Sequence, residues 1–509
     1  MTGKSSQLSA KTHVPTPVHT ALSPFTATPG RALSPLRPPQ ACISLNMLVG
    51  LLALTEATLL FLSGCLIWIG YVGLGSFDNV IRYLVAIITG IGIFLVIEYF
   101  SGQYSQERLR ILHRNLLRAP INWMLTVVIL VTCAFGLKVG EDYSRIWLFS
   151  WLGTGIILLI SNRLIAAFIV KRLASTGLVG ERIAILGAGD RGQLLISHLT
   201  EHSDPYTKII GVFDERRAPR VPEVVCGHVL LGGVDDLVAA ARYGAIDTVI
   251  ITLPWSATHR LQHIISALEA VSVDVRLSPG AFGFQIPAPK FHQVAAIPML
   301  SVWDRPIKEW HAVAKWLEDK LIASVALILL GPLMLLIAGM IKLESPGPAL
   351  FRQLRFGFNN ETINVLKFRT MYLDSQDVSG TARTTRNDPR VTRVGRILRR
   401  TSLDELPQIL NVLKGEMSIV GPRPHALTMK IGNRYYFDAV KGYAARHKVR
   451  PGITGWAQVN DLRGEIDSIE KAQNRVKYDI MYVNNWSLAF DLRIIAMTFF
   501  ALFKTKNAY

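Results

Sequence analysis

The sequence predicts a membrane protein with four N-terminal transmembrane helices, a central α/β domain and a C-terminal α/β domain that contains a re-entrant membrane helix. Of the 509 residues, 50% are hydrophobic, and the mean hydropathy of +0.30 is too high for an ordinary soluble protein. Several apolar runs approach the roughly 20 residues that cross a bilayer. Elsewhere, short β-branched runs alternate with helical patterns, which is typical of α/β domains.

The N-terminal region divides into a polar tail and four apolar segments. Residues 1–42 are rich in Pro, Ser, Thr and Ala and contain basic residues but no acid, which predicts a disordered basic tail. This stretch does not fit a signal peptide, because the apolar run begins late and is far too long. Four segments, each close to the length of a bilayer-spanning helix, make up a predicted transmembrane region at 43–172: 43–73, 80–98, 121–137 and 147–170.

Basic residues in the short loops predict the orientation of these helices. The tail, the loop at 101–120 and the Lys171-Arg172 pair are rich in Lys and Arg, whereas the loops at 74–79 and 138–145 hold few. Loops rich in Lys and Arg stay on the cytoplasmic side of a membrane. We therefore expect a multi-pass protein of the inner, cytoplasmic membrane, in which the chain after residue 172 begins in the cytoplasm.

A parallel α/β domain is predicted for residues 178–300. Its first turn has the pattern Gly187-x-Gly189-x-x-Gly192 between a strand and a helix, and Asp214 follows the second strand. This context matches the dinucleotide-binding fingerprint of a Rossmann-like domain, in which the acid binds the ribose. Two interpretations stay open: nucleotide binding at these four residues, or a sheet that keeps only the glycine turn. No Tyr-x-x-x-Lys pair is evident for hydride chemistry.

A fifth apolar run, Leu321 to Ile341, differs from the first four because Gly331 and Pro332 lie at its midpoint. At 1.5 Å per residue it is long enough to span about 30 Å. Basic residues flank both of its ends, however, which disfavours carrying either flank across the membrane. Because proline breaks or kinks a helix, we expect a membrane helix of residues 317–342 that is broken at Pro332 and returns to the cytoplasmic face.

The net charge of +18 favours anionic partners such as nucleic acid, lipid headgroups or phosphorylated substrates. Residues after 300 hold 31 Lys and Arg against 19 Asp and Glu, so most of the excess lies there. The aromatic residues are not interleaved with these cations as a base-stacking surface requires, so we expect no nucleic-acid partner. Membrane lipids and phosphorylated substrates remain the expected partners. The four cysteines form no C-x-x-C pair and indicate neither zinc nor a disulfide framework.

Two adjacent carboxylates, Asp404 and Glu405, follow an arginine-rich stretch in "RRTSLDELPQIL". Ser402 and Glu405 fit a helix capping box, whereas Pro407 would then fall inside the helix and favours Asp404 as the cap. Either way, the acids lie at a helix N-terminus. Chemistry is the alternative: with a sugar diphosphate, one carboxylate could attack phosphorus while the other holds Mg²⁺ and arginines neutralise the phosphate oxygens.

Four long motifs in the C-terminal region carry a family resemblance: "SPGPALFRQLRFGFN", "KFRTM", "TSLDELPQILNVLKGEMSIVGPRP" and "RPGITGWAQVN". With them, the chain from Trp310 to Tyr509 resembles the bacterial sugar transferase family, the monotopic phosphoglycosyl transferases that start glycan assembly on a polyprenyl phosphate. The four-helix region and the α/β domain resemble the large form of this family. The resemblance therefore covers nearly all of the chain beyond the tail.

The resemblance implies that residues 303–509 form a sugar-phosphate transferase domain with a covalent mechanism. In the family, the aspartate of the dyad is the nucleophile and the glutamate helps to bind Mg²⁺, which correspond to Asp404 and Glu405. An arginine five residues before the nucleophile contacts phosphate, which corresponds to Arg399. Further positions in the matching motifs are expected to bind substrate: Lys367, Arg369, Arg423, His425 and Arg450.

Three further expectations follow from the same resemblance. The apolar helix with the break at Pro332 corresponds to the family's re-entrant membrane helix. Asp479 and Asp491 fall in C-terminal signatures of the family, and they either cap helices or contact metal or substrate. The α/β domain of the large forms does not supply the chemistry, so a ligand at Gly187 to Gly192 is expected to be regulatory.

The segments "GPRPHA" and "RGEIDSIEKAQNRVKYDIMYVNNWS" resemble the glucose-transferring branch of the family. This implies transfer of glucose 1-phosphate from UDP-glucose to undecaprenyl phosphate, with release of UMP, as the first membrane step of exopolysaccharide assembly at the bacterial inner membrane. Alternatives are galactose 1-phosphate or another hexose 1-phosphate, a membrane-tethered NAD-dependent epimerase or dehydratase, and a non-catalytic scaffold. The final polysaccharide and the oligomeric state, a homo-oligomer included, are left open.

Overall fold

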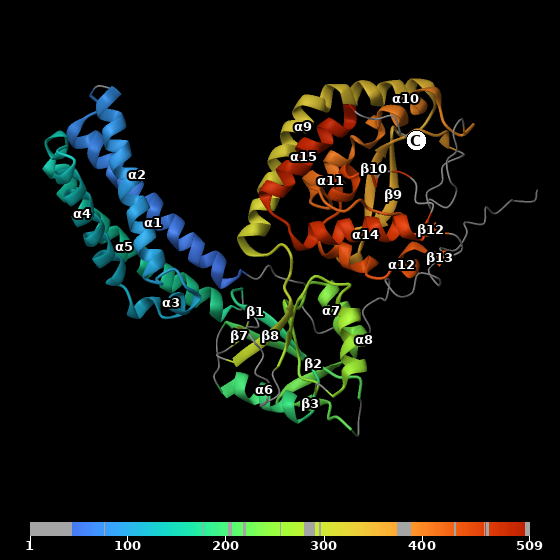
Figure 1. The fold of residues 1–509 in the computed structure, drawn as a ribbon, viewed down its shortest axis with the longest axis horizontal. Coiled ribbons are helices and arrows are strands. Elements are labelled where there is room, and N and C mark those ends of the chain that lie inside the picture. The colour runs from blue at the N-terminus through green and yellow to red at the C-terminus, as the bar shows by residue number, and fades with distance from the viewer. Residues whose placement is uncertain are drawn as a thin grey trace, which may run out of the picture.

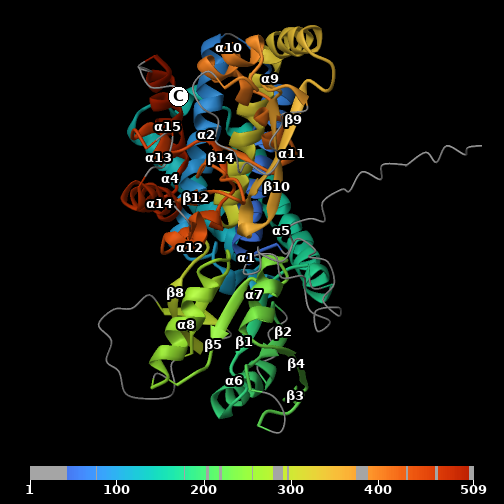
Figure 2. The same cartoon turned by 90° about the vertical axis from the view of Figure 1, so that its right-hand side faces the viewer.

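The computed structural model describes residues 43–503 except 76, 177, 202–205, 217–219, 255, 279–290, 295–296, 374–387, 432–433, 463 and 465–467. Figure 1 shows three bodies: a helical bundle in blue and teal, an α/β domain in green and a C-terminal domain in yellow to red. Figure 2 shows the α/β domain below the C-terminal domain. The predicted basic tail lies outside the described residues.

Four long helices lie where the four apolar segments were predicted: α1 (Leu45–Ile67, continued by the π-helical turn η2, Trp68–Val72), α2 (Phe77–Phe100), α4 (Arg118–Gly136) and α5 (Arg145–Ser175). Each of the four is long and apolar enough to cross a membrane. Short helical turns lie between them: α3 (Gln106–Arg110), η3 (Leu112–Arg114) and η4 (Gly140–Asp142).

Tryptophan side chains fill the centre of this bundle. Trp123, Trp147 and Trp151 are buried, and the Trp151 ring centroid lies 4.8 Å from that of Trp123 and 5.1 Å from that of Trp147. The indole N–H groups of Trp147 and Trp151 donate to backbone carbonyls of α1 at 3.1 and 2.9 Å, which satisfies donors that would be costly to bury alone. A side chain at Gly155 would collide with Trp123, so glycine permits the close approach of α5 to α4.

A buried ion triad ties together three of these helices. Arg163 of α5 donates to Glu56 of α1 and to Glu98 of α2, both at 2.7 Å, and the three side chains are at most 1% exposed. Tyr104 donates to the second oxygen of Glu56, and Asn122 donates to the second oxygen of Glu98. Charged groups inside an apolar bundle are tolerated only when they are paired and hydrogen-bonded in this way.

We predict that Arg163→Leu lowers the free energy of unfolding by about 3–5 kcal/mol, because it leaves two buried carboxylates without a counter-charge. Thermal unfolding of the purified protein in detergent measures the change. Arg172→Leu is the matched control, since Arg172 lies on the same helix but is exposed, and it should melt like the wild type. Equal melting temperatures for the two variants would contradict a structural role of the triad.

The α/β domain has the predicted parallel sheet, with strand order β3-β4-β2-β1-β5-β6-β8-β7. The parallel strands are β1 (Glu181–Leu186), β2 (Thr207–Phe213), β4 (His228–Gly232), β5 (Thr248–Ile251) and β6 (Asp274–Leu277). Three antiparallel strands that were not predicted complete it: β3 (Val224–Val225), β7 (Phe291–Val294) and β8 (Ile297–Trp303). Its helices are α6 (Asp190–Glu201), α7 (Val234–Arg242) and α8 (Thr258–Leu268).

The C-terminal domain combines one long helix with two small sheets. Helix α9 (Glu309–Glu344) precedes the antiparallel hairpin of β9 (Leu350–Phe356) and β10 (Thr362–Phe368), and β11 (Ser418–Val420) pairs in parallel with β14 (Gly452–Thr454). The main helices around them are α10 (Arg393–Thr401), α11 (Gln408–Lys414), α14 (Ile469–Asn484) and α15 (Leu488–Phe503).

Short elements connect these parts of the C-terminal domain. The turn η5 (Phe358–Asn360) joins β9 to β10, and η7 (Leu403–Glu405) joins α10 to α11. The others follow β11: β12 (Lys430–Ile431), β13 (Arg434–Tyr435), α12 (Tyr436–Ala439), η8 (Tyr443–Lys448) and α13 (Trp456–Val459).

The predicted break at Pro332 is wrong, because α9 stays helical from Glu309 to Glu344 through the proline. Its ribbon instead bends as it passes from the flank of the domain to the upper edge (Figure 1). Proline removes one backbone hydrogen bond, which bends a helix without ending it when the adjacent turns are held by packing. Residues after Pro332 are held in this way against the hairpin and α10: Met334, Ile337 and Ile341. The return of the chain to the same membrane face stays a prediction.

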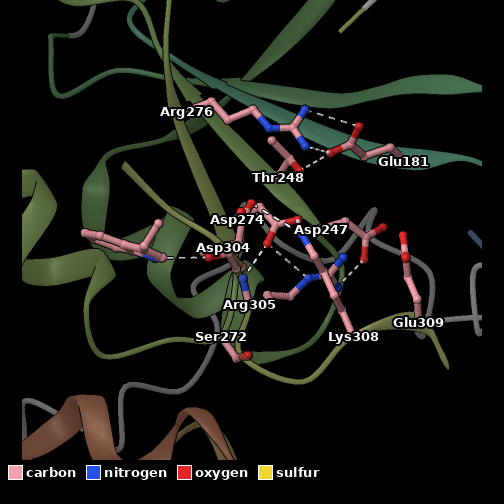
Figure 3. Close-up of polar contacts among 12 residues, drawn as sticks. Glu181, Asp247, Thr248, Ser272, Asp274, Arg276, Asp304, Arg305, Lys308 and Glu309 are labelled. Carbon is pink, nitrogen blue, oxygen red and sulfur yellow. Dashed lines mark hydrogen bonds and ion pairs between the residues drawn. The ribbon is translucent and has the colours of Figure 1, made fainter. Parts of the chain in front are cut away.

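Ion pairs join the α/β domain to the start of α9 (Figure 3). Arg305 and Lys308 lie between β8 and α9, whereas Asp247 and Asp274 lie where β5 and β6 begin. Arg305 contacts Asp247 at 3.0 Å and Asp274 at 3.6 Å, and Lys308 contacts Asp274 at 3.6 Å. Asp247 is also paired with Arg182 at 2.8 Å. The connection into α9 is therefore fixed to the edge of the sheet where the parallel strands begin.

Three further contacts hold the C-terminal domain to its neighbours. Asn359 and Asn360 of η5 have positive φ angles of 53° and 60°. The side-chain oxygen of Asn359 accepts from the Ser272 backbone amide at 2.8 Å, and the side-chain amide of Asn360 donates to the Ala270 backbone carbonyl at 2.7 Å. At the start of α9, the Asn46 amide of α1 donates to the Glu309 carboxylate at 2.9 Å. All three bodies thus meet near the N-terminal end of α9.

Candidate active site

The dyad Asp404-Glu405 lies on a short 3₁₀ turn between two helices. Ser402 ends α10 in the left-handed conformation, with φ of 57°, and makes no side-chain capping hydrogen bond to η7. The predicted capping box is therefore wrong. Pro407 immediately precedes α11, whose first residue is Gln408, because proline cannot donate within a helix but is tolerated where one begins. The dyad thus occupies the turn before α11, and neither acid caps it.

The turn is held against the hairpin by a buried amide. Asn411 of α11 accepts from the Leu366 amide at 3.0 Å and donates to the Asn364 carbonyl at 2.8 Å, so its side chain closes on the backbone of β10. Asn411 is 0% exposed. A buried amide with both partners fixes its element strongly, since an unpaired polar group there would be costly. This contact places the dyad opposite Lys367, which lies on the same strand.

Two cationic side chains bind Glu405. Arg423 donates to both carboxylate oxygens, at 2.5 and 3.2 Å, and Lys367 donates to Oε1 at 2.8 Å. Asp404 lies 3.9 Å from the Lys367 ammonium, and among the described residues no group donates a hydrogen bond to its carboxylate. The two neighbouring acids therefore have different surroundings, although the side chains of both are 14% exposed.

These surroundings move the pKa values of the two acids in opposite directions. Burial alone would raise the pKa of Glu405, but the charges and hydrogen bonds of Arg423 and Lys367 hold it well below its usual value. Burial raises the pKa of Asp404, Lys367 opposes this, and the charge of Glu405 adds to it. Glu405 is thus a fixed anion, whereas Asp404 keeps its lone pairs free for a bond to an incoming atom.

Arg399 lies near the dyad, as the resemblance implied. Its Nε donates to the Thr370 hydroxyl at 2.8 Å, and its charge lowers the pKa of Asp404. Arg450 is exposed and lies just before β14, and its backbone carbonyl lies close to Gly421, two residues before Arg423. The structure thus brings Lys367, Arg399 and Arg423 to the dyad, whereas Arg450 makes no ion pair with either acid.

Arg369 was expected to bind substrate, and the structure corrects this. Its guanidinium is 1% exposed and donates to the carbonyls of Pro346 at 2.6 Å and Ser345 at 2.7 Å, with a longer contact of 3.4 Å to Ile341. The Ser345 and Pro346 carbonyls lie just beyond the C-terminal end of α9, where carbonyls lack intrahelical donors and a cation is favourable. The Arg369 side chain therefore caps a helix end and is not available to a phosphate.

His425 was also expected to bind substrate, and it is buried instead. The ring is 4% exposed and accepts from Arg446 at 2.7 Å, with the Tyr443 hydroxyl 3.2 Å away. Burial and the charge of Arg446 hold the pKa of His425 well below its usual value, so the imidazole is neutral. Since Arg446 also donates to the Arg423 carbonyl at 2.7 Å, His425 belongs to the support beneath Arg423.

The two C-terminal aspartates serve as structural ion-pair partners. Asp479 contacts Arg446 at 2.7 Å and is 2% exposed. Asp491 is 0% exposed, contacts Lys315 at 2.7 Å and accepts from the Tyr482 hydroxyl at 2.8 Å. Both carboxylates are enclosed by protein partners, so the alternative of metal or substrate contact is not supported by their geometry.

The glycine turn of the α/β domain has the predicted backbone, but the acid of the fingerprint, Asp214, is already hydrogen-bonded to protein groups. Gly187 has φ of 115°, and a side chain at Gly192 would collide with the Gly187 carbonyl, so the tight turn requires both glycines. Asp214 accepts from the Ala188 amide at 2.9 Å, and its two oxygens accept from the Arg216 side chain at 3.1 and 2.8 Å. The carboxylate that would bind a ribose is thus already paired with an arginine.

The fold and site define a class: a membrane-associated enzyme in which a free carboxylate and a cation-bound carboxylate lie beside lysine and arginine side chains. Two family comparisons narrow this. Residues 310–505 match the family described as bacterial sugar transferase, and residues 99–279 match the family described as CoA-binding domain. The chain belongs to the bacterial sugar transferase family.

Individual relatives agree with this assignment. The chain is 36% identical over 388 residues to the UDP-glucose:undecaprenyl-phosphate glucose-1-phosphate transferase of Escherichia coli strain K12, which covers 76% of this chain and 82% of the relative. The protein of the same name from Xanthomonas campestris is 35% identical over 374 residues, 73% of this chain and 77% of the relative. An N-acetylgalactosaminephosphotransferase of Aeromonas hydrophila is 43% identical over 181 residues, 35% of this chain and 41% of the relative.

We predict that Arg369→Ala lowers the free energy of unfolding by about 2–4 kcal/mol, because it leaves the carbonyls of buried Ser345 and of Pro346 at the end of α9 without their donor. Chemical or thermal unfolding in detergent measures this. Arg352→Ala is the control, since Arg352 is an exposed arginine of β9. If Arg369→Ala is as stable as the wild type but binds nucleotide sugar weakly, the structural role is contradicted and Arg369 is a substrate-binding residue.

Proposed function

We propose that this protein transfers glucose 1-phosphate from UDP-glucose to undecaprenyl phosphate and releases UMP, as the first membrane step of exopolysaccharide assembly. The observation that carries the proposal is the pair of unlike acids: Glu405 bound by Arg423 and Lys367, beside Asp404 with no hydrogen-bond donor among the described residues. The names of the relatives from Escherichia coli and Xanthomonas support glucose as the sugar.

The proposed reaction has two displacement steps at one phosphorus atom. A carboxylate oxygen of Asp404 attacks the phosphorus that carries glucose, the bond from phosphorus to the UMP oxygen breaks, and UMP leaves. An oxygen of undecaprenyl phosphate then attacks the same phosphorus, and the bond to Asp404 breaks. No base is required, since the acceptor phosphate is already ionised at pH 7. Lys367, Arg399 and Arg423 supply the positive charge that offsets the negative charge of the phosphate oxygens.

The acids of this site fit a magnesium ion as the resident metal. Carboxylate oxygen is the ligand that Mg²⁺ prefers, and one or two carboxylates usually suffice when substrate phosphates complete the coordination. Glu405 Oε2 accepts one hydrogen bond, at 3.2 Å from Arg423, so lone pairs stay free on it. Among the described residues no group of three metal-ligating side chains exists, which agrees with a metal held partly by substrate. Bound there, the ion would neutralise phosphate oxygens.

The two rival functions lack a comparable arrangement. A nicotinamide-dependent epimerase or dehydratase needs a dinucleotide site, but the ribose-binding acid of the fingerprint, Asp214, is paired with Arg216. A non-catalytic scaffold does not need a buried dyad with opposed pKa shifts. A different hexose is the closer alternative, since the relative from Aeromonas hydrophila carries N-acetylgalactosamine in its name.

Covalent catalysis gives the decisive test. Enzyme quenched after mixing with UDP-glucose and Mg²⁺, without lipid, should gain one hexose phosphate on the peptide that contains Asp404, as measured by mass spectrometry. Asp404→Asn should abolish the adduct, whereas the control Asp438→Asn, at an exposed acid of α12, should keep it. A panel of UDP-sugars with undecaprenyl phosphate, read by UMP release, identifies the sugar. The absence of UMP release with every sugar tested would refute the proposed function.

We further propose that the transferase domain faces the cytoplasm and that α9 enters the membrane and returns. Large apolar side chains exposed along α9 support contact with lipid: Leu321, Val325, Ile328, Leu329, Leu335 and Leu336. Basic residues at both ends support a common side for its two flanks. The bend of the helix after its midpoint (Figure 1) gives a shape that need not cross the bilayer.

Reporter fusions test this topology. Fusions after residues 172, 355 and 509 should all report a cytoplasmic location, because four crossings return the chain to its starting side and α9 does not add a fifth. A fusion after residue 140, between α4 and α5, is the control and should report the periplasm. A periplasmic report after residue 355 would mean that α9 spans the bilayer.

A further inference from the structure

Strand β9 carries an arginine, Arg355, that lies on the same side of the hairpin as Lys367. In the antiparallel register, Lys367 lies opposite Phe351 and Arg355 lies opposite Ile363. Residues that face each other across such a pair share one side of the sheet, and every second residue returns to it. Lys367, Gln353 and Arg355 are therefore on the same side, the side on which the dyad lies.

The Arg355 guanidinium is held in a fixed position by neutral partners. Its Nε and Nη2 donate to the Gln353 side-chain oxygen at 3.2 and 2.8 Å, and its Nη1 donates to the Pro424 carbonyl at 2.6 Å. A guanidinium has five N–H donors, so one N–H on each terminal nitrogen is left over. No acid among the described residues lies within ion-pair distance of Arg355, in contrast to Arg423, which is paired with Glu405.

The charges around Arg355 do not balance without a ligand. Burial, followed by the like charge of Arg423, lowers the pKa of Arg355 to about 10, so the side chain is still a cation at neutral pH. Four cations, Lys367, Arg355, Arg399 and Arg423, act on the two acids. An excess of two positive charges in a partly buried site is unfavourable unless an anion of similar charge completes it.

We infer that Arg355 is a phosphate-binding residue of the reaction, whose two remaining N–H groups bind non-bridging oxygens of a phosphate. The inference rests on the proposed function. Gln353 and Pro424 set the orientation of the fork, and a fork of two parallel donors matches two phosphate oxygens. No proton moves to or from Arg355. The ligand chemistry is a phosphate group, which either the nucleotide sugar or the acceptor lipid can supply.

The two half-reactions separate these sources. The first is adduct formation on Asp404 from UDP-glucose alone, and the second is transfer of the preformed adduct to undecaprenyl phosphate. Arg355→Gln should lower kcat/KM of at least one half-reaction about 100-fold, as for the loss of one aligned donor to a phosphoryl group, and Arg355→Lys should recover part of it. A loss in the first assigns Arg355 to the nucleotide diphosphate, and a loss in the second assigns it to the acceptor phosphate.

Two further variants keep the test decisive. Gln353→Glu gives Arg355 a carboxylate partner and should weaken substrate binding in a protein that melts like wild type, even where Arg355→Gln folds poorly. Arg352→Gln changes the exposed neighbour on the other side of β9 and should leave both half-reactions unchanged. Unaltered half-reactions in Arg355→Gln and Gln353→Glu would overturn the inference.

Failure of the proposed function would look different. If the wild type forms no adduct on Asp404, the two-step transfer is wrong, but calorimetric binding of UDP to wild type, Arg355→Gln and Gln353→Glu still measures the role of Arg355. Weaker UDP binding by both variants would support a phosphate contact. Equal binding by all three proteins, together with the absence of an adduct, would reject both proposals.

Discussion

The capped C-terminal end of α9 fixes the geometry on which the rest of the active site depends. Arg369 donates to the Ser345 and Pro346 carbonyls that follow the helix, while Glu344 accepts from the Arg393 and Val394 amides that begin α10. Lys367 lies two residues before Arg369 on the hairpin, and the dyad follows α10. One helix end, held by charge-assisted hydrogen bonds, therefore fixes both the lysine and the acids, which explains how the long apolar helix α9 can set distances in the candidate active site.

Electrostatics then give the neighbouring acids different surroundings, on which the proposed division of tasks rests. Arg423 and Lys367 donate to Glu405, so Glu405 stays ionised, while Asp404 keeps free lone pairs near the Lys367 ammonium. In the proposed function, the excess of positive charge, to which Arg355 contributes, is unfavourable by itself and would be offset by a bound polyanion. Groups that are already in position need not reorganise as charge develops during phosphoryl transfer. In enzymes of this kind, such electrostatic preorganisation supplies most of the rate enhancement.

Long elements and contiguous motifs were predictable from the sequence, whereas side-chain direction was not. Apolar runs and glycine patterns depend on local chemistry, and the dyad lies within one motif. The prediction that Arg369 binds substrate was wrong because β10 ends at Phe368. Arg369 therefore lies beyond the strand, and its side chain is directed toward the end of α9. His425 failed because Arg446, distant in sequence, covers it. Arg355 was missed because only the register of the hairpin shows that it shares a face with Lys367.

The α/β domain contacts the transferase domain through the edge of its sheet that is opposite the glycine turn. Asp247 and Asp274 lie where the strands begin and bind the linker into α9 (Figure 3). At the same edge, the Ala270 carbonyl accepts from the Asn360 side-chain amide. The side-chain oxygen of Asn360 lies 2.5 Å from His447 Nδ1, and His447 follows Arg446, which donates to the Arg423 carbonyl. These contacts involve no residue of the glycine turn. The sheet can therefore support the candidate active site from the edge where its strands begin, independently of any ligand at the glycine turn. Such support does not require a free ribose-binding acid, and Asp214 is paired with Arg216.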